Sequence, residues 1–185
     1  FLRLILPLYP VEARYFAGAL AFLATAAIVF GALSSFAQTD FKRLVAYSSV
    51  NHMGFVVLGI AAAALASGTP DAVIAMNGAV LQMFNHGLSA AGMFFLVGVI
   101  YERTHTRNLE EYGGLFTLIP VYGAILIFTS MSSLGLPGLN GFISEFLVVR
   151  GTWPIFTGYV AISMAGLFFT GAYILKALKK CCTDR

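Results

Sequence analysis

The stretch SSLGLPGLNGFISEF, residues 132–146, lies in a very hydrophobic part of the chain and yet contains residues that helices tolerate poorly. Pro137 lacks a backbone N–H and clashes with the preceding helical turn. Its three glycines can adopt backbone angles that other residues rarely adopt, namely Gly135, Gly138 and Gly141. The stretch therefore predicts a break in a helix, and the acidic residue Glu145 follows that break by one turn.

Around this stretch the chain has the composition of a membrane protein. Hydrophobic residues make up 59% of its 185 residues and charged residues only 10%, which is typical of integral membrane proteins. No charge lies between Arg14 and Asp40 or between Arg150 and Lys176, and each gap exceeds the roughly 20 apolar residues that cross a bilayer. A soluble all-α core is disfavoured because soluble helices keep a polar face. We expect an all-α fold, a polytopic bundle of transmembrane helices.

We expect five membrane spans, one of them discontinuous, in a single transmembrane domain that covers residues 1–185. Short loops separate the spans, and the end of an earlier helix precedes them at about 2–9. The expected spans are residues 16–37, 44–66, 72–100, 115–150 with a break at 135–141, and 155–178. The chain starts at Phe1 and shows no signal peptide, which indicates a fragment of a longer protein.

The length of the region 115–150 decides how often it crosses the membrane. A continuous helix over this region would be about 54 Å long, whereas the hydrocarbon core is only about 30 Å thick. A second crossing does not fit, because only nine residues, 142–150, follow Gly141 up to Arg150. The length therefore favours a single crossing that is interrupted within GLPGLNG, residues 135–141.

The basic residues predict the orientation of these spans in the membrane. Three of them fall on one side, namely Arg3, Arg14 and Arg150, and eight on the other, namely Lys42, Arg43, Arg103, Arg107, Lys176, Lys179, Lys180 and Arg185. The side with eight should be cytoplasmic, or its equivalent in an organelle. A bacterial plasma membrane is the expected location, with an organelle inner membrane as the alternative.

Glu145 is the first candidate for a functional residue. A carboxylate at membrane depth is energetically costly, so an acid in a membrane span is by default a functional hypothesis. The alternative is an acid at the membrane surface, because Arg150 is only about 7.5 Å away along a helix. The break favours the functional interpretation, since unwound backbone at membrane depth must line a hydrated cavity or be buried in protein.

Two histidines are predicted near the middle of consecutive spans. His52 lies about 13 Å along its helix from Arg43 and shares a face with Ser48 and Ser49. His86 belongs to a polar stripe that also contains Gln82, Asn85 and Ser89. Such histidines with polar neighbours favour a hydrated proton path, and structural hydrogen bonding is the alternative. Proton transfer is thus assigned to Glu145, His52 and His86.

The remaining candidates support these three residues. The polar neighbours are Ser48, Ser49, Gln82, Asn85 and Ser89, the break contributes Gly135, Pro137, Gly138, Asn140 and Gly141, and Lys42 lies near a membrane surface. A basic anchor at the interface is the simpler interpretation of Lys42.

Several other kinds of chemistry are excluded by the absence of their motifs. The chain has no Walker A loop, no GxGxxG motif after a strand, and no cysteine spacing that suits an iron–sulfur cluster. Cys181 and Cys182 are adjacent and have no neighbouring His or Asp cluster for zinc. The net charge of +3 comes from basic residues that flank apolar spans, so nucleic acid is not expected as a partner. We expect no cofactor and no metal in this chain.

Three segments carry a resemblance to a known family. QTDFKRLVAYSSVNHMGFVVLGI, QMFNHGLSAAGMFFLVGVIYERTHTR and SLGLPGLNGFISEFLV together resemble the proton-translocating, antiporter-like membrane subunits of respiratory complex I, the NADH:quinone oxidoreductase. The first and third segments are shared with related antiporter subunits. YERTHTR is more selective for the chain M, or subunit-four, type.

The resemblance implies a fold and a function. Members have about fourteen helices with two inverted five-helix repeats, and this chain is similar to the second repeat. The resemblance implies that Glu145 is the terminal proton carrier of a half-channel and that His52, His86 and waters lead to it. The parent complex is implied to use NADH, FMN, iron–sulfur clusters and quinone. The implied partners are other membrane subunits of complex I, the lipid bilayer and protons.

Two alternatives to this function remain open. One is a subunit of a multisubunit cation/proton antiporter, and the other is a scaffold that keeps the fold without translocating protons. The family's glutamate on the fifth helix and its lysines on the seventh and eighth helices are outside this chain, so the resemblance implies that this piece does not pump protons by itself.

Overall fold

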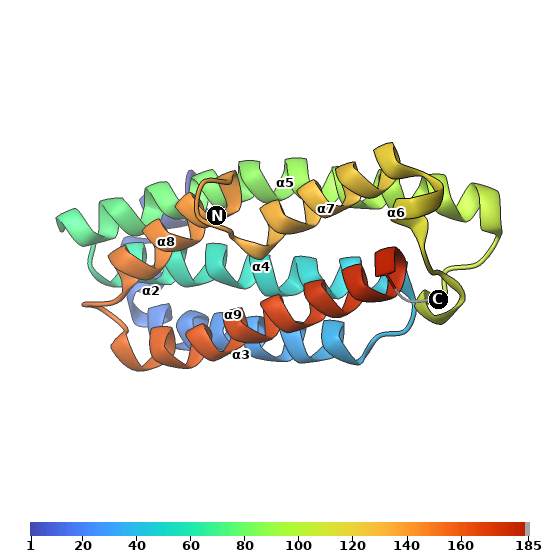
Figure 1. The fold of residues 1–185 in the computed structure, drawn as a ribbon. Coiled ribbons are helices and arrows are strands. Elements are labelled where there is room, and N and C mark those ends of the chain that lie inside the picture. The colour runs from blue at the N-terminus through green and yellow to red at the C-terminus, as the bar shows by residue number, and fades with distance from the viewer. Residues whose placement is uncertain (184–185) are drawn as a thin grey trace.

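The computed structural model describes residues 1–183, and its long helices follow from the apolar gaps between the charges. Four helices are long and apolar enough to cross a membrane, namely α3 (Ala17–Ala37), α4 (Phe41–Leu65), α5 (Pro70–Thr104) and the helix that begins with α9 (Thr157–Leu178). They run along a common direction (Figure 1). Within the described residues no β-strand forms. The prediction of an all-α, polytopic membrane bundle is confirmed.

The region 115–150 forms two helices in place of one. α7 (Pro120–Leu134) has 15 residues and α8 (Asn140–Thr152) has 13, and they lie end to end beside α5 (Figure 1). At 1.5 Å per residue they are about 22 and 20 Å long, so neither alone reaches the roughly 30 Å of a hydrocarbon core. The number of membrane crossings stays a prediction.

Polar side chains fix the starts of two long helices. The carboxylate of Asp40 accepts a hydrogen bond from the backbone N–H of Arg43 at the start of α4. The hydroxyl of Thr69 accepts one from Ala72 N–H, and Pro70 occupies the first turn of α5. Both arrangements satisfy N–H groups that have no partner inside the helix. α5 therefore begins directly after the turn that follows α4.

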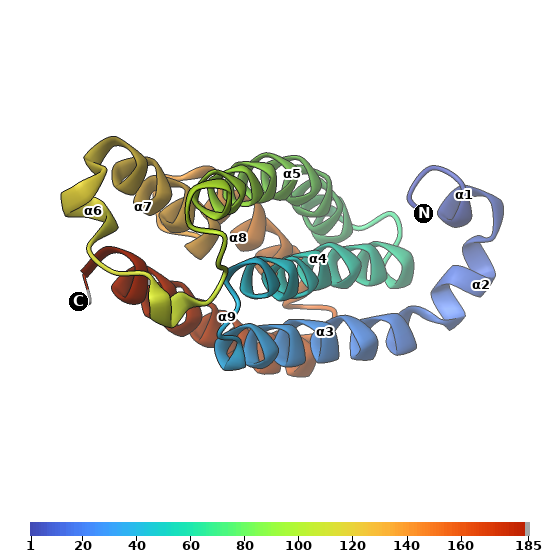
Figure 2. The same ribbon diagram turned by 90° about the vertical axis from the view of Figure 1, so that its right-hand side faces the viewer.

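α4 is at the centre of the bundle and is the most deeply buried of the four long helices. α3 packs on one side of it, with α9 mainly against α3, and α5 and α8 pack on the other side, with α7 against α5 (Figure 2). Its contact with α3 is close because Gly54 of α4 faces Ile28 of α3. Gly166 of α9 also faces Ile28, so α9 approaches α3 closely as well. Small residues allow such close backbone approach in membrane helix pairs. The groups on α4 are thus enclosed by helices on both sides.

This packing predicts a specific loss of stability for Gly166→Ala. A Cβ at this position would lie 2.6 Å from Ile28 Cγ2 and 3.3 Å from its backbone carbonyl, and such overpacking costs about 1–3 kcal/mol. The measurement is the thermal unfolding midpoint of the detergent-solubilised full-length protein. Gly171→Ala on the same helix is the control, because its Cβ would meet nothing closer than 3.5 Å. Equal midpoints for the two variants would contradict the close approach.

Shorter elements complete the described chain. They are α1 (Ile5–Leu8), α2 (Pro10–Tyr15), η1 (Leu109–Glu111), α6 (Leu115–Leu118) and the π-helix η2 (Lys179–Thr183). Where the sequence predicts the end of one earlier helix, the structure has α1 and α2, which meet at Tyr9 (Figure 2). α2 packs against the end of α4 through Ala13 and Ala64.

The loops at the C-terminal end of α9 are joined by polar contacts. Arg107 Nε lies 3.5 Å from Asp40 Oδ2, and Lys176 Nζ donates to the carbonyl of Phe36 over 2.6 Å. These contacts connect the α3–α4 loop with the segment after α5 and with α9. Arg185, one of the eight basic residues counted for this side, lies outside the described residues.

Candidate functional site

The break between α7 and α8 is built by its glycines and proline. Gly135 ends α7 in the left-handed conformation, with φ of +74°, and Leu136 N–H donates back to Met131 O, as in a Schellman motif. The next four residues form a turn that Leu139 N–H closes onto Leu136 O over 3.0 Å. Pro137 and Gly138, with φ of +100° at Gly138, occupy the positions that a type II turn reserves for them.

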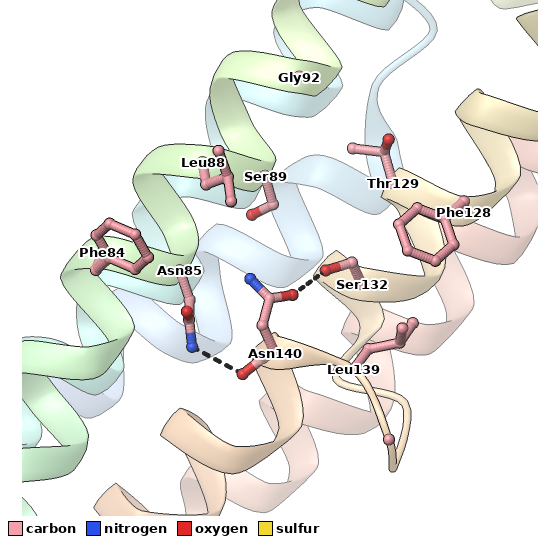
Figure 3. A pocket seen from close by; sticks show the side chains of 11 residues that line it. Phe84, Asn85, Leu88, Ser89, Gly92, Phe128, Thr129, Ser132, Leu139 and Asn140 are labelled. Carbon is pink, nitrogen blue, oxygen red and sulfur yellow. Dashed lines mark hydrogen bonds between the residues drawn. The ribbon is translucent and has the colours of Figure 1, made fainter.

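Side chains from two helices bridge this break. The hydroxyl of Ser132 on α7 donates to Asn140 Oδ1. The amide of Asn85 on α5 donates to the backbone carbonyl of Asn140 over 2.8 Å. Both bonds are visible in Figure 3. The first turn of α8 is therefore tied to both flanking helices, although α8 itself has no side-chain cap.

Glu145 lies inside the bundle, at one helical turn beyond the break. Its exposed fraction is 4%, and its Oε1 lies 2.9 Å from His52 Nδ1 and accepts from Gln82 Nε2 over 3.4 Å. Its Oε2 occupies the space next to Gly135, where a Cβ would lie 2.8 Å away. The carboxyl group is thus held between α4, α5 and the end of α7.

The two histidines are neighbours. The rings of His52 on α4 and His86 on α5 have centroids 5.2 Å apart. His52 is buried, with 2% of its surface exposed, whereas His86 is half-buried. His52 is the closer of the two to the acid, and its second nitrogen, Nε2, lies 3.5 Å from the hydroxyl of Tyr173 on α9.

The polar stripe on α5 also takes part in this cluster. Gln82 Oε1 accepts from the hydroxyl of Ser144 over 2.5 Å, and Asn85 Nδ2 donates to the same hydroxyl over 3.1 Å. Ser89 donates to the carbonyl of His86 on its own helix. These bonds give Gln82 and Asn85 fixed orientations toward α8.

A small cavity lies among these side chains. Its volume is about 10 Å³, roughly the least that holds one water molecule. It is lined by His52, Gln82, Asn85, His86, Ser89, Ser132, Ser133, Gly141 and Glu145. A larger pocket of about 440 Å³ shares Asn85, Ser89 and Ser132 with it and is shown in Figure 3. The same three polar residues therefore line both spaces.

Other predicted residues lie apart from the carboxyl group. Ser48 and Ser49 are half-buried and donate to the carbonyl of Val45 on their own helix. Lys42 is exposed at the start of α4, about 15 Å along the helix from His52. Pro137 and Gly138 are exposed in the turn and contribute shape instead of polar groups.

Sequence reasoning missed several residues of the cluster. Ser144 precedes Glu145 directly, and its spacing of four from Asn140 would have placed both on one helical face. Tyr173 is on the last long helix, and no sequence pattern relates it to His52, which precedes it by 121 positions.

The cluster can exchange protons but offers no metal site. Nδ1 of His52 and Oε1 of Glu145 are within hydrogen-bond distance, so one proton can pass between them, and Nε2 gives the imidazole a second exchange point. No group of three or more His, Cys, Asp or Glu residues that could hold a metal ion is found among residues 1–183.

Comparisons with known proteins agree with one another. Subunit M of the NADH-quinone oxidoreductase of Pseudomonas aeruginosa is 46% identical over 174 residues, which are 94% of this chain and 33% of that protein. In a structure of respiratory complex I from Thermus thermophilus with bound NADH, one chain matches with a TM-score of 0.89 and 32% identity over 100% of this chain and 40% of that chain. A chain of the Mrp complex from a Dietzia species matches with a TM-score of 0.84 over 94% of this chain and 31% of that chain, at 19% identity, which shows a common fold.

The extent of these matches fixes what they establish. This chain spans about a third of the length of the curated relatives that it matches. The family model described as NADH:quinone oxidoreductase/Mrp antiporter, transmembrane region, matches residues 1–172. Because that match covers nearly the whole chain, the chain belongs to the NADH:quinone oxidoreductase/Mrp antiporter transmembrane family.

Proposed function

We propose that this chain is part of a proton-translocating membrane subunit of an NADH:quinone oxidoreductase. The observation that carries the proposal is the buried contact of 2.9 Å between His52 Nδ1 and Glu145 Oε1, next to a broken helix. A carboxyl group and an imidazole inside a membrane bundle are costly to bury without a task. The names of the relatives at 36–46% identity support an oxidoreductase as the parent complex.

In this proposal three side chains carry the proton and the others hold them. His86 and His52 deliver the proton through the water-sized cavity, and Glu145 is the terminal carrier. Gln82 keeps Oε1 oriented, while Asn85 and Asn140 hold the broken helix in place. Lys42 acts as a basic anchor at the interface.

Electron transfer belongs to other subunits of the parent complex. NADH, FMN, iron–sulfur clusters and quinone are proposed for that complex, and none of them for this chain. Other membrane subunits and lipid are the proposed partners, and a bacterial plasma membrane is the proposed location, with the side of Lys42 and Lys176 facing the cytoplasm. Movement of charge in those subunits would change the proton affinity of the cluster through electrostatics.

The second candidate is a subunit of a cation/proton antiporter. The Mrp complex shares this fold at 19% identity, so the fold alone fits both functions. The two differ in what drives the proton: electron transfer from NADH in one and a cation gradient in the other.

The test uses inverted membrane vesicles that contain the assembled complex with the full-length subunit. Addition of NADH is expected to acidify the vesicle interior, and deletion of the subunit is expected to abolish this. In vesicles with the intact subunit, a sodium gradient without NADH should leave the internal pH unchanged. Acidification by the sodium gradient and none by NADH would favour the antiporter instead.

Gly135→Ala tests whether the break shapes the carboxyl site. Its Cβ would lie 2.8 Å from Glu145 Oε2, and φ of +74° is unfavourable for alanine by about 1–2 kcal/mol. We expect proton translocation to fall several-fold. Gly138→Ala is the control, because it also has a positive φ but its Cβ would meet nothing within 4 Å. Equal translocation by the two variants would show that strain, not displacement of the carboxyl group, is the cause.

A further inference from the structure

Tyr173 on α9 contacts the proposed proton path from a side that contributes no other residue to it. Its side chain is 1% exposed, and its hydroxyl lies 3.5 Å from His52 Nε2, the nitrogen that faces away from Glu145. A phenol hydroxyl both donates and accepts one hydrogen bond. It can therefore take part in proton transfer with His52 while remaining a neutral group.

The surroundings of this hydroxyl offer it more than one partner. Side chains of Asn51, Thr170 and Ser48 adjoin it. Asn51 Nδ2 donates to Thr170 Oγ1 over 2.5 Å, whereas the buried Asn51 Oδ1 has no hydrogen-bond partner among the described residues. An unpaired buried acceptor is unfavourable. The hydrogen bond of the phenol hydroxyl is with His52 Nε2, so its proton is available to that nitrogen.

Polar groups continue from Tyr173 toward one end of the bundle. Ser48 is half-buried and lies one helical turn before His52 on α4. Lys176 lies three residues beyond Tyr173 on α9 and reaches the carbonyl of Phe36 at the end of α3. This is the end that carries the larger group of basic residues. The contacts thus lead away from Glu145 and toward the basic side.

We propose that Tyr173 is a proton-relay residue that connects His52 Nε2 with a water molecule at Ser48, and so with the basic end of the bundle. The inference rests on the proposed function and extends its path. The phenol O–H bond breaks as its proton moves to Nε2, and a new O–H bond forms with a proton from the water, which in turn takes a proton from the solvent at the basic end. The proton on Nδ1 leaves to Glu145 Oε1, so one proton enters, one leaves, and the phenol and the imidazole return to their starting charge.

Tyr173→Phe in the full-length subunit of the assembled complex tests this relay. The substitution keeps the ring and removes only the hydroxyl, and we expect NADH-driven proton translocation to slow about a hundredfold, the lower end of the range for loss of a proton-transfer group. Tyr122→Phe is the matched control. It removes another buried hydroxyl, which donates to Leu96 O over 2.9 Å, about 15 Å along α5 from His86, and should leave translocation unchanged.

Two further measurements separate a relay from a structural bond. In a relay, Ser48→Ala added to Tyr173→Phe should slow translocation no further, because both groups lie on one path, whereas independent structural effects would multiply. The thermal unfolding midpoint of Tyr173→Phe should also fall no further than that of Tyr122→Phe, so that lost stability does not explain the slower translocation. Equal slowing by both tyrosine variants, or multiplied effects with Ser48→Ala, would overturn the relay.

Glu145→Gln distinguishes failure of this inference from failure of the proposed function. If Glu145→Gln stops translocation and Tyr173→Phe does not slow it, the relay through Tyr173 is wrong and the function stands. If neither variant changes translocation, both proposals are wrong.

Discussion

Glu145→Gln is expected to stop proton translocation through this subunit while the bundle stays assembled. Glutamine has nearly the same shape as glutamate, and its oxygen can still accept the hydrogen bond from Gln82. Its amide cannot take up and release a proton as a carboxylate does, so a proton on His52 cannot pass on to residue 145. The measurement is the number of protons translocated per electron by the assembled complex in membrane vesicles, with the amount of assembled complex determined in parallel.

Glu12→Gln is the matched control for this prediction. Glu12 is exposed on α2, outside the helices that surround the cluster, and loses the same carboxyl group. Unchanged protons per electron in Glu145→Gln, with normal assembly, would leave the chain as a scaffold of this fold. A loss of equal size in Glu12→Gln would show that general surface charge is responsible.

The fold was largely accessible from the sequence because a membrane imposes simple rules. Long uncharged segments must be helices, since lipid offers no hydrogen bonds to open backbone. The break between α7 and α8 was also predictable, because Pro137 and the glycines around it disfavour a continuous helix. The close approach of α4 and α9 to α3 was not, because it depends on which glycines face Ile28.

The sequence allowed single residues of the candidate site to be predicted, but not the contacts between them. Periodicity placed Gln82, Asn85 and His86 on one face of α5, and the cost of a buried acid identified Glu145. The contact between Glu145 and His52 joins two helices and residues 93 positions apart. Helical periodicity describes one helix at a time, so it carries no information about such contacts.

The contact between His52 and Glu145 also predicts a large effect on stability. His52→Leu keeps a side chain of comparable volume but leaves the carboxyl group with Gln82 as its only remaining partner among the described side chains. Removal of one partner of a buried hydrogen bond leaves the other unsatisfied at a cost of about 1–3 kcal/mol, more for a charged group, while replacement of both can be nearly neutral. We therefore expect a marked fall in the thermal unfolding midpoint for His52→Leu and partial recovery in the double variant with Glu145→Gln.

A double-mutant cycle measures this coupling in the solubilised complex with the full-length subunit. Residues in direct contact show interaction energies of about 0.5–3 kcal/mol, whereas distant residues add within about 0.5 kcal/mol. His86→Leu is the control, because the half-buried His86 touches the ring of His52 and has no carboxylate partner within the described part of the chain. It should cost less than His52→Leu. Simple additivity between His52→Leu and Glu145→Gln would mean that the two side chains are independent, and the close contact that carries the proposed proton transfer would then have no energetic counterpart.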